Sequence, residues 1–436
     1  MPVLYIVHCI DTEGPLRETL SATFERINDT FGFNFAPSPE TLALLQNKQI
    51  DLSGVEESVA RMISPRLLEY NDTWDKIQSM LDHVTSFEFR NKFIDDFENG
   101  WIYSWHCMDH VGYLNNPRHK DVGYGNVFRY YRNYLSSSNN NTDEINWHFH
   151  PIAVTGNPLC AATSYVNSYS TLYDLICRRI IEDDWFPVVN RPGFHSERPD
   201  SHLFLEQWIP FDYANQSHED ATDQPDLANG RFGDWSRAST SWRGYHPSIH
   251  DYQQEGSCRR TIFRCLNVGT RFNNLTAMHV NEAFDDARSF GSSILAFANH
   301  DYRDIRDDVD YVRNLIEPLR TKYSDVSISF CGAEAAARHL YRTSDCPELC
   351  ISSRLVGNVL YVHCESGLVF GSQPFLALRG HDGKYFHDNF DVSIPDKEWK
   401  YVFDSQTIPL SALSVIGVGA AGRYGGFSTT KHVLNS

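Results

Sequence analysis

Hydrophobic and polar positions follow two different periods along the first 340 residues. Short apolar runs, such as residues 2–10 and 294–298, have the length and composition of buried β-strands. Between such runs, apolar residues three or four positions apart predict helices, for example at residues 171–182 and 277–290. Residues 16–100 are mostly helical in pattern. Strand and helix therefore alternate, which predicts an α/β fold built on a parallel sheet or a (β/α) barrel.

The pattern changes near residue 345. Residues 350–436 hold short alternating runs separated by turn residues, without a helical period. We therefore expect two domains. Residues 1–343 would form the α/β domain, with long insertions at about 16–100 and 215–260, and residues 346–436 would form an accessory, sandwich-like all-β domain.

Composition narrows the possible functions. The 436 residues include 56 Asp and Glu against 38 Lys and Arg, for a formal charge of −18. Nucleic acids and anionic lipids attract clustered positive charge, so we exclude nucleic-acid binding as the main role. No apolar run reaches the length of a transmembrane helix, and the first residues lack the basic start of a signal peptide. The ten cysteines form no CxxC pair, which favours reduced thiols in a cytoplasmic protein.

Two strand ends carry pairs of residues that can bind a metal or transfer protons. In (β/α) barrels, catalytic groups collect at the carboxyl ends of the strands. Asp11 and Glu13 are two residues apart and share a face, so one carboxylate can bind a metal while the other removes a proton from water. His148 and His150 have the same spacing, and their imidazoles can converge on one cation.

Two further strand ends supply an arginine and a histidine. Arg191 precedes a Pro-Gly turn, where its guanidinium could hold a carboxylate base by paired hydrogen bonds. His300 ends an apolar strand, and the adjacent Asp301 could orient it as a general acid. Taken alone, each motif also fits an ordinary role, such as a helix-capping acidic turn, exposed loop histidines or a surface ion pair. Their combination in one chain favours a catalytic site.

In their order along the chain, the four motifs resemble the polysaccharide deacetylase superfamily (NodB homology, carbohydrate esterase family 4), as a divergent branch. The resemblance covers about residues 3–340 and implies a distorted (β/α) barrel. It assigns Asp11 as the base, Arg191 as the tether of the base and His300 as the acid, with Glu13, His148 and His150 as metal ligands. Family members usually space the histidines four apart and place the acidic ligand directly after the base, so both spacings depart from the family pattern. The residue that supports the acid has two candidates, Asp234 and Asp301.

The resemblance implies a metal-dependent hydrolase, with Zn²⁺ as the expected cation. Its expected reaction removes an acyl group, above all N-acetyl, from a carbohydrate in bacterial surface-polysaccharide biosynthesis. Two alternatives stay open: hydrolysis of another, cyclic amide on the same scaffold, and a carbohydrate-binding protein with a decayed site. Asp109 at another strand end, Trp235 in the aromatic 215–260 segment, and Asp301 are the candidate substrate contacts.

Overall fold

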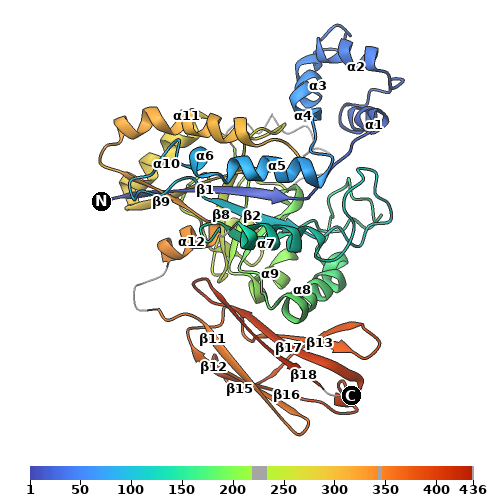
Figure 1. Ribbon diagram of the computed structural model, residues 1–436, viewed down its shortest axis with the longest axis vertical. Helices are drawn as coiled ribbons and strands as arrows, with labels where there is room; N and C mark the ends of the chain where they lie inside the picture. Colours follow the sequence, from blue (N-terminus) through green and yellow to red (C-terminus); the bar gives the residue numbers. More distant parts are fainter. Residues whose placement is uncertain (139, 219–232, 342–345, 435–436) are drawn as a thin grey trace.

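The computed structural model describes residues 1–138, 140–218, 233–341 and 346–434. Its centre is a closed barrel of seven parallel strands (Figure 1). In order around the ring these strands are β1 (Val3–Thr12), β2 (Tyr103–Met108), β3 (Glu144–Phe149), β4 (Val189–Pro192), β5 (Phe211–Asn215), β8 (Thr261–Asn267) and β9 (Ser292–His300). The expected α/β barrel is therefore confirmed at this level.

Strand β1 closes the ring. One of its edges pairs with β9 from Val3 to Asp11. The other edge pairs first with β10 (Ser327–Cys331), over Val3–Val7, and then with β2, over His8–Thr12. The side chains of β1 alternate, because successive residues of a strand point to opposite faces. Leu4, Ile6 and Ile10 pack with apolar residues of the surrounding helices, whereas Asp11 lies on the other face, which leads to the pocket described below.

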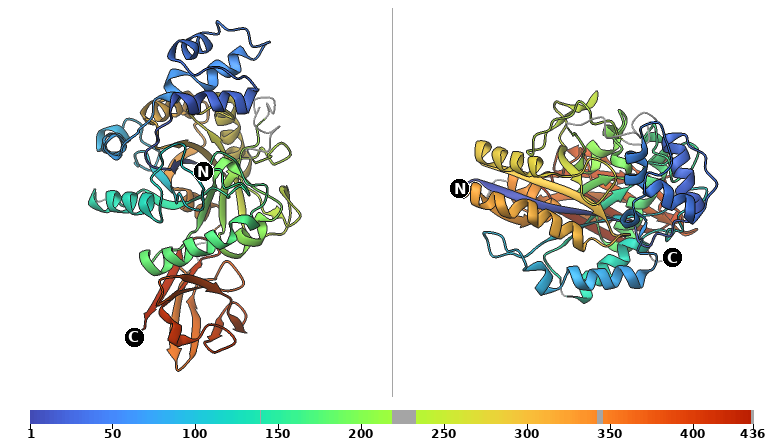
Figure 2. Two further views of the ribbon diagram at one scale, coloured as in Figure 1. Left: turned by 90° about the vertical axis from the view of Figure 1, so that its right-hand side faces the viewer. Right: turned by 90° about the horizontal axis from the view of Figure 1, so that it is seen from above.

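Helices cover the outside of the barrel and form a projecting group beyond it. The covering helices are α5 (Trp74–Val84), α6 (Phe87–Arg90), α7 (Asn126–Ser137), α8 (Tyr169–Asp183), α9 (Ser201–Trp208), α10 (Ala277–Phe290), α11 (Arg306–Lys322) and α12 (Ala333–Tyr341). The projecting group, visible in Figures 1 and 2, is α1 (Leu20–Phe31), α2 (Pro39–Gln46), α3 (Glu56–Met62) and α4 (Pro65–Leu68). It has a small core of its own, which includes Phe24, Ile27 and Val59.

The structure adds two barrel strands that the apolar pattern does not predict. Strands β5 and β8 flank the expected 215–260 loop, which also contains a short hairpin of β6 (Pro247–Ser248) and β7 (Asp251–Glu255). Both added strands carry buried charges that interrupt the apolar run: Asp212 in β5 pairs with Arg260 beside β8, at 2.7 Å, and Arg264 lies within β8. Residues 219–232 of this segment lie outside the described residues.

The C-terminal part is all-β, as expected, and forms two four-stranded antiparallel sheets. Their strand orders are β11 (Cys350–Val356), β12 (Val359–Ser366), β16 (Glu398–Val402), β15 (Asp391–Ile394), and β14 (Tyr385–Asp388), β13 (Phe375–Gly380), β17 (Leu413–Ala421), β18 (Phe427–Val433). Residues of both sheets share one apolar cluster, and the second sheet also packs against α8. A Cβ added at Gly417 would lie 2.7 Å from Ile180 of α8, so the close approach requires glycine there.

The junction between the two parts falls at residues 342–345, outside the described residues. The expected boundary between residues 343 and 346 falls on these same residues and stays a prediction. Among the helices that the structure describes, none combines the length and apolar character needed to cross a bilayer.

Candidate metal centre

The carboxyl ends of four barrel strands bring the four sequence motifs together. Strands β1, β3 and β9 place five of the predicted side chains around one pocket: Asp11, Glu13, His148, His150 and His300. Arg191, from β4, is fully buried behind Asp11. The structure thus gathers all six predicted catalytic and metal-binding residues, although they are spread over 290 positions of the chain.

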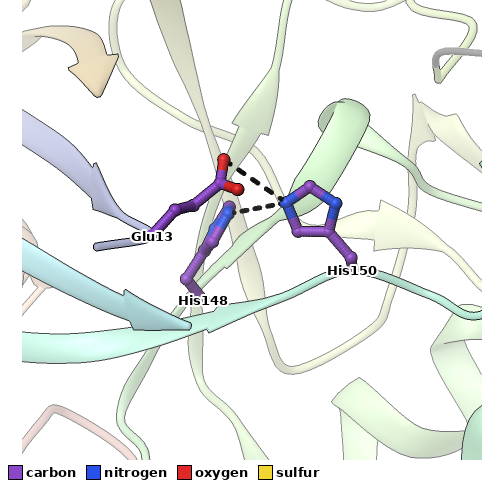
Figure 3. A group of neighbouring side chains, drawn as sticks. All are labelled: Glu13, His148 and His150. Carbon is purple, nitrogen blue, oxygen red and sulfur yellow. Dashed lines mark hydrogen bonds and ion pairs between the residues drawn. The ribbon is translucent and has the colours of Figure 1, made fainter. Parts of the chain in front are cut away.

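Glu13, His148 and His150 form a group that could hold a metal ion. One potential ligand atom from each lies within 4.8 Å of the other two. Figure 3 shows the three side chains turned toward one another, with 3.0 Å between the Nε2 atoms of the histidines and 3.8 Å from His150 Nε2 to Glu13 Oε1. The expected convergence of the two imidazoles is therefore present.

The protonation of this group suits a cation. His148 Nδ1 lies 2.6 Å from the carbonyl oxygen of Arg191, and donating this hydrogen bond leaves the Nε2 lone pair facing His150. Burial lowers the pKa of both histidines to about 4, so both rings are neutral near pH 7. Two neutral nitrogens facing each other at 3.0 Å need a shared proton or a cation between them.

Glu13 carries the negative charge of the group. Burial alone would raise its pKa, but Lys120 and the nearby histidines outweigh burial and hold the pKa well below its usual range. Lys120 Nζ lies 2.9 Å from Glu13 Oε2. The structure therefore supplies a charged oxygen ligand beside two neutral nitrogen ligands, which is the donor set of many catalytic metal sites.

Asp11 stands beside the group without belonging to it. Arg191 Nε donates a 2.6 Å hydrogen bond to Asp11 Oδ1, and Arg191 Nη1 donates to the carbonyl oxygen of Tyr213 at 2.9 Å. Burial raises the pKa of Asp11 to about 6, against the opposing effect of Arg191. A carboxylate held in orientation and tuned close to neutrality can take up a proton during a reaction.

His300 faces both carboxylates. Its Nε2 lies 3.7 Å from Asp11 Oδ2 and 3.9 Å from Glu13 Oε1. Its Nδ1 is buried and has no hydrogen-bond partner among the described residues. The expectation that Asp301 orients this ring is wrong. The Asp301 carboxylate instead accepts hydrogen bonds from the backbone N–H groups of Glu13 and Gly14, at 2.8 and 3.0 Å, and so fixes the turn that presents Glu13.

The expected substrate contacts lie elsewhere. The described residues that line the pocket include none of Asp109, Trp235 and Asp301. Asp109, the residue after β2, is paired with Arg179 of α8 at 2.5 Å. Trp235 is buried and donates from Nε1 to the carbonyl oxygen of His195 at 2.9 Å. Asp234, the other candidate support for His300, accepts hydrogen bonds from the N–H and hydroxyl groups of Ser236.

Three residues of the site were missed by the sequence analysis. Lys120 comes from a polar loop that reads as ordinary surface, and no local pattern ties it to Glu13. His110 Nε2 donates to the carbonyl oxygen of Glu13 at 2.8 Å. His195 lines the pocket, and its Nδ1 is buried without a partner among the described residues. His195 is the last residue of the motif that begins at Arg191. Its place directly after a strand is the one signal in the sequence that could have identified His195 as a site residue.

Gly193 gives the site a sharp steric requirement. A Cβ at this position would lie 2.0 Å from Cδ2 of the His150 ring. We therefore expect Gly193→Ala to displace His150 and to weaken metal binding by on the order of tenfold or more, as loss of ligand orientation does at other metal sites. The affinity of the purified variant for added Zn²⁺ tests this, with Gly291→Ala as the control. An added Cβ at Gly291 meets strain, at φ 90°, but no atom within 4 Å. Unchanged affinity in Gly193→Ala would contradict the assignment of His150 as a ligand.

The site thus joins a possible cation-binding group to an arginine-held carboxylate and a histidine that faces it. Its residues come from four strands and two loops. Comparison with known proteins finds no matching family model, no matching curated protein and no matching solved structure.

Proposed function

We propose that this protein is a metal-dependent hydrolase that removes an acyl group, most specifically N-acetyl, from a carbohydrate. One observation carries the proposal: the buried group of Glu13, His148 and His150 lies directly beside Asp11, which Arg191 holds. The polysaccharide deacetylase resemblance of the four motifs agrees with this arrangement. On this proposal the seven-stranded ring is a distorted barrel of the deacetylase type.

The three candidate ligands fit a divalent cation. Their donor set, two imidazole nitrogens and one carboxylate oxygen, is that of several catalytic zinc sites, and we propose Zn²⁺ as the cation. When bound, such a cation supplies a Lewis acid that polarises a carbonyl oxygen and acidifies water. Lys120 balances the charge of Glu13. When a cation binds, the Lys120 ammonium group either stays beside the cation or moves away from Glu13.

The protein's own residues handle the protons. Asp11 takes a proton from the attacking water, and Arg191 keeps the carboxylate in position. Burial holds the pKa of His300 well below its usual value, so the ring is neutral at rest. His300 Nε2 lies 3.7 Å from Asp11 Oδ2, so during the reaction the ring has to move within hydrogen-bond distance for the proton gained by Asp11 to pass to His300 and then to the departing amine. The proton that leaves the water thus ends on the amine product, and both groups return to their starting states.

Several features support a sugar substrate. Aromatic side chains that suit the apolar faces of sugar rings line the pocket, among them Tyr113, Phe194 and Tyr302. The projecting helices contribute Arg26 and Met62 to the same pocket, so the 16–100 insertion helps to shape it. The ten cysteines are all free, in agreement with the cytoplasmic location that we propose for a step of surface-polysaccharide biosynthesis.

A metal analysis combined with an acetate-release screen tests the proposal. We expect purified protein to hold about one divalent cation per chain, as catalytic zinc sites do. We also expect it to release acetate from N-acetylated sugars, and a chelator should remove both properties. Cyclic amides tested in parallel separate the second candidate reaction, because ring opening without acetate release would favour it. Metal-free protein that releases no acetate from any acetylated sugar would leave the binding-protein alternative.

A further inference from the structure

Four arginines line the pocket together with the candidate metal group: Arg26, Arg118, Arg271 and Arg303. They come from four separate segments of the chain, namely α1, the loop between β2 and α7, the loop after β8 and the loop after β9. We call them the arginine cluster. The chain as a whole carries a formal charge of −18, so this local positive charge is contrary to the overall composition.

The negative charge that faces the cluster is small. Glu18 forms an ion pair with Arg26 and lies 3.5 Å from Arg118 Nε. Arg271 Nε donates to the carbonyl oxygen of Met62 at 3.1 Å, and Arg303 Nε donates to that of Leu67 at 3.3 Å. These carbonyls carry no net charge.

The other acids near the cluster already have partners. Asp308, an acid near Arg303, is paired with Arg66, and Glu13 is paired with Lys120.

Part of the cluster's hydrogen-bonding capacity is unused. Arg26 is only 7% exposed, and its Nε and Nη1 atoms are buried without a hydrogen-bond partner among the described residues. Arg271 Nη2 is in the same state. A buried guanidinium that lacks partners is costly, because it stays protonated and cannot escape the cost by losing its charge. Both residues line the pocket, where an anion would offer acceptors to their guanidinium groups.

The positive charge of the cluster lowers the pKa of groups beside it. Burial lowers the pKa of Arg271 to about 10, and repulsion from Arg303 adds to this effect. Burial would raise the pKa of Tyr70, but the four arginines together outweigh it and lower the pKa to about 8. Tyr70 donates to Glu18 Oε2 at 3.3 Å, so it lies within the cluster.

We propose that the arginine cluster binds an anionic group of the substrate, a carboxylate or a phosphate attached to the sugar. Planar guanidinium groups match both anions because they can donate two parallel hydrogen bonds. The assignment as substrate contact rests on the proposed hydrolase, since the same pocket holds the candidate metal group. The proposed anion site implies that the substrate is an N-acylated sugar that carries a carboxylate or a phosphate, and that it is not a neutral glycan.

Anion binding can be measured without any catalysis. Calorimetric titration of full-length protein, treated with a chelator so that no metal attracts the anion, would use inorganic phosphate and glucuronate as probes. We expect at least one of them to bind wild-type protein, and Arg271→Gln or Arg118→Gln to weaken that binding by on the order of tenfold or more. The Arg118 side chain is 28% exposed, whereas Arg26 and Arg303 are each 7% exposed, so replacing Arg118 disturbs the fold less than replacing either of those two.

Arg354→Gln is the matched control, because Arg354 is exposed on β11, over the ring of Tyr361, and does not line the pocket. Equal binding by wild type and both cluster variants, or no binding of either probe by wild type, would overturn the proposal. The two probes also distinguish the source of the anion. Binding through the cluster without acetate release from any sugar would contradict the proposed reaction and leave the anion site supported.

Discussion

Asp11→Asn is expected to lower the turnover number by about 10²–10⁴-fold, the usual worth of a general base, while the metal content stays unchanged. Asparagine fills nearly the same space, so Arg191 and His300 keep their positions, but the amide cannot take up the proton of the attacking water. Asp11 lies outside the group of three candidate ligands, and its Oδ1 is already held by Arg191 at 2.6 Å.

Turnover and metal content should be measured on the same preparation, since a loss of turnover with unchanged metal content identifies a base. Asp234→Asn is the control, because Asp234 is an acid that bonds to Ser236 and does not line this pocket. A joint loss of metal and turnover in Asp11→Asn would instead make Asp11 a ligand, and the roles of Asp11 and Glu13 would have to be exchanged.

His150→Ala is expected to lower metal affinity by about 100-fold or more, because catalytic zinc normally takes three protein ligands and two seldom retain it. His148→Ala should have the same effect. The two Nε2 atoms lie 3.0 Å apart and are the two nitrogen donors of the group, so removing either ring removes one of the two. Equilibrium titration with Zn²⁺ measures the change directly and does not depend on knowing the substrate.

The control for this pair is His363→Ala, a histidine on β12 in the C-terminal sheets, far along the chain from the pocket. If His150→Ala kept its affinity, the second nitrogen would have to come from another histidine of the pocket. His195 and His300 both line it, and the double variants with each would identify which one binds.

The predictable part of the site is the part that depends on local strand geometry. Asp11 and Glu13, and likewise His148 and His150, share a face because extended chain repeats every two residues. The same rule explains the failure at Asp301. Neighbouring residues point in different directions, so Asp301 turns toward the backbone of Glu13 while His300 faces the pocket.

The remaining features depend on contacts between distant segments, which no local pattern encodes. Lys120 reaches Glu13 across more than 100 residues of chain, and Arg26 comes from a helix that projects beyond the barrel. Strand β5 escaped prediction because buried Asp212 breaks its apolar run, and its ion pair with Arg260 exists only after folding. The alternation of strands and helices was visible because β1 and β9 contain long apolar runs, as strands covered on both faces do.

The closure of the ring through β1 and β9 has a consequence for the order in which the protein is completed during synthesis. One edge of β1 can pair with β2 early, but the opposite edge finds its partner only when residues 292–300 have been made. Contacts of such long sequence separation slow folding, and the edge of β1 stays open in the meantime. Glu13, His148 and His150 all belong to the first 150 residues, whereas His300 arrives with the closing strand. The growing chain therefore carries a complete set of candidate ligands about 150 residues of translation before it gains the histidine that faces them.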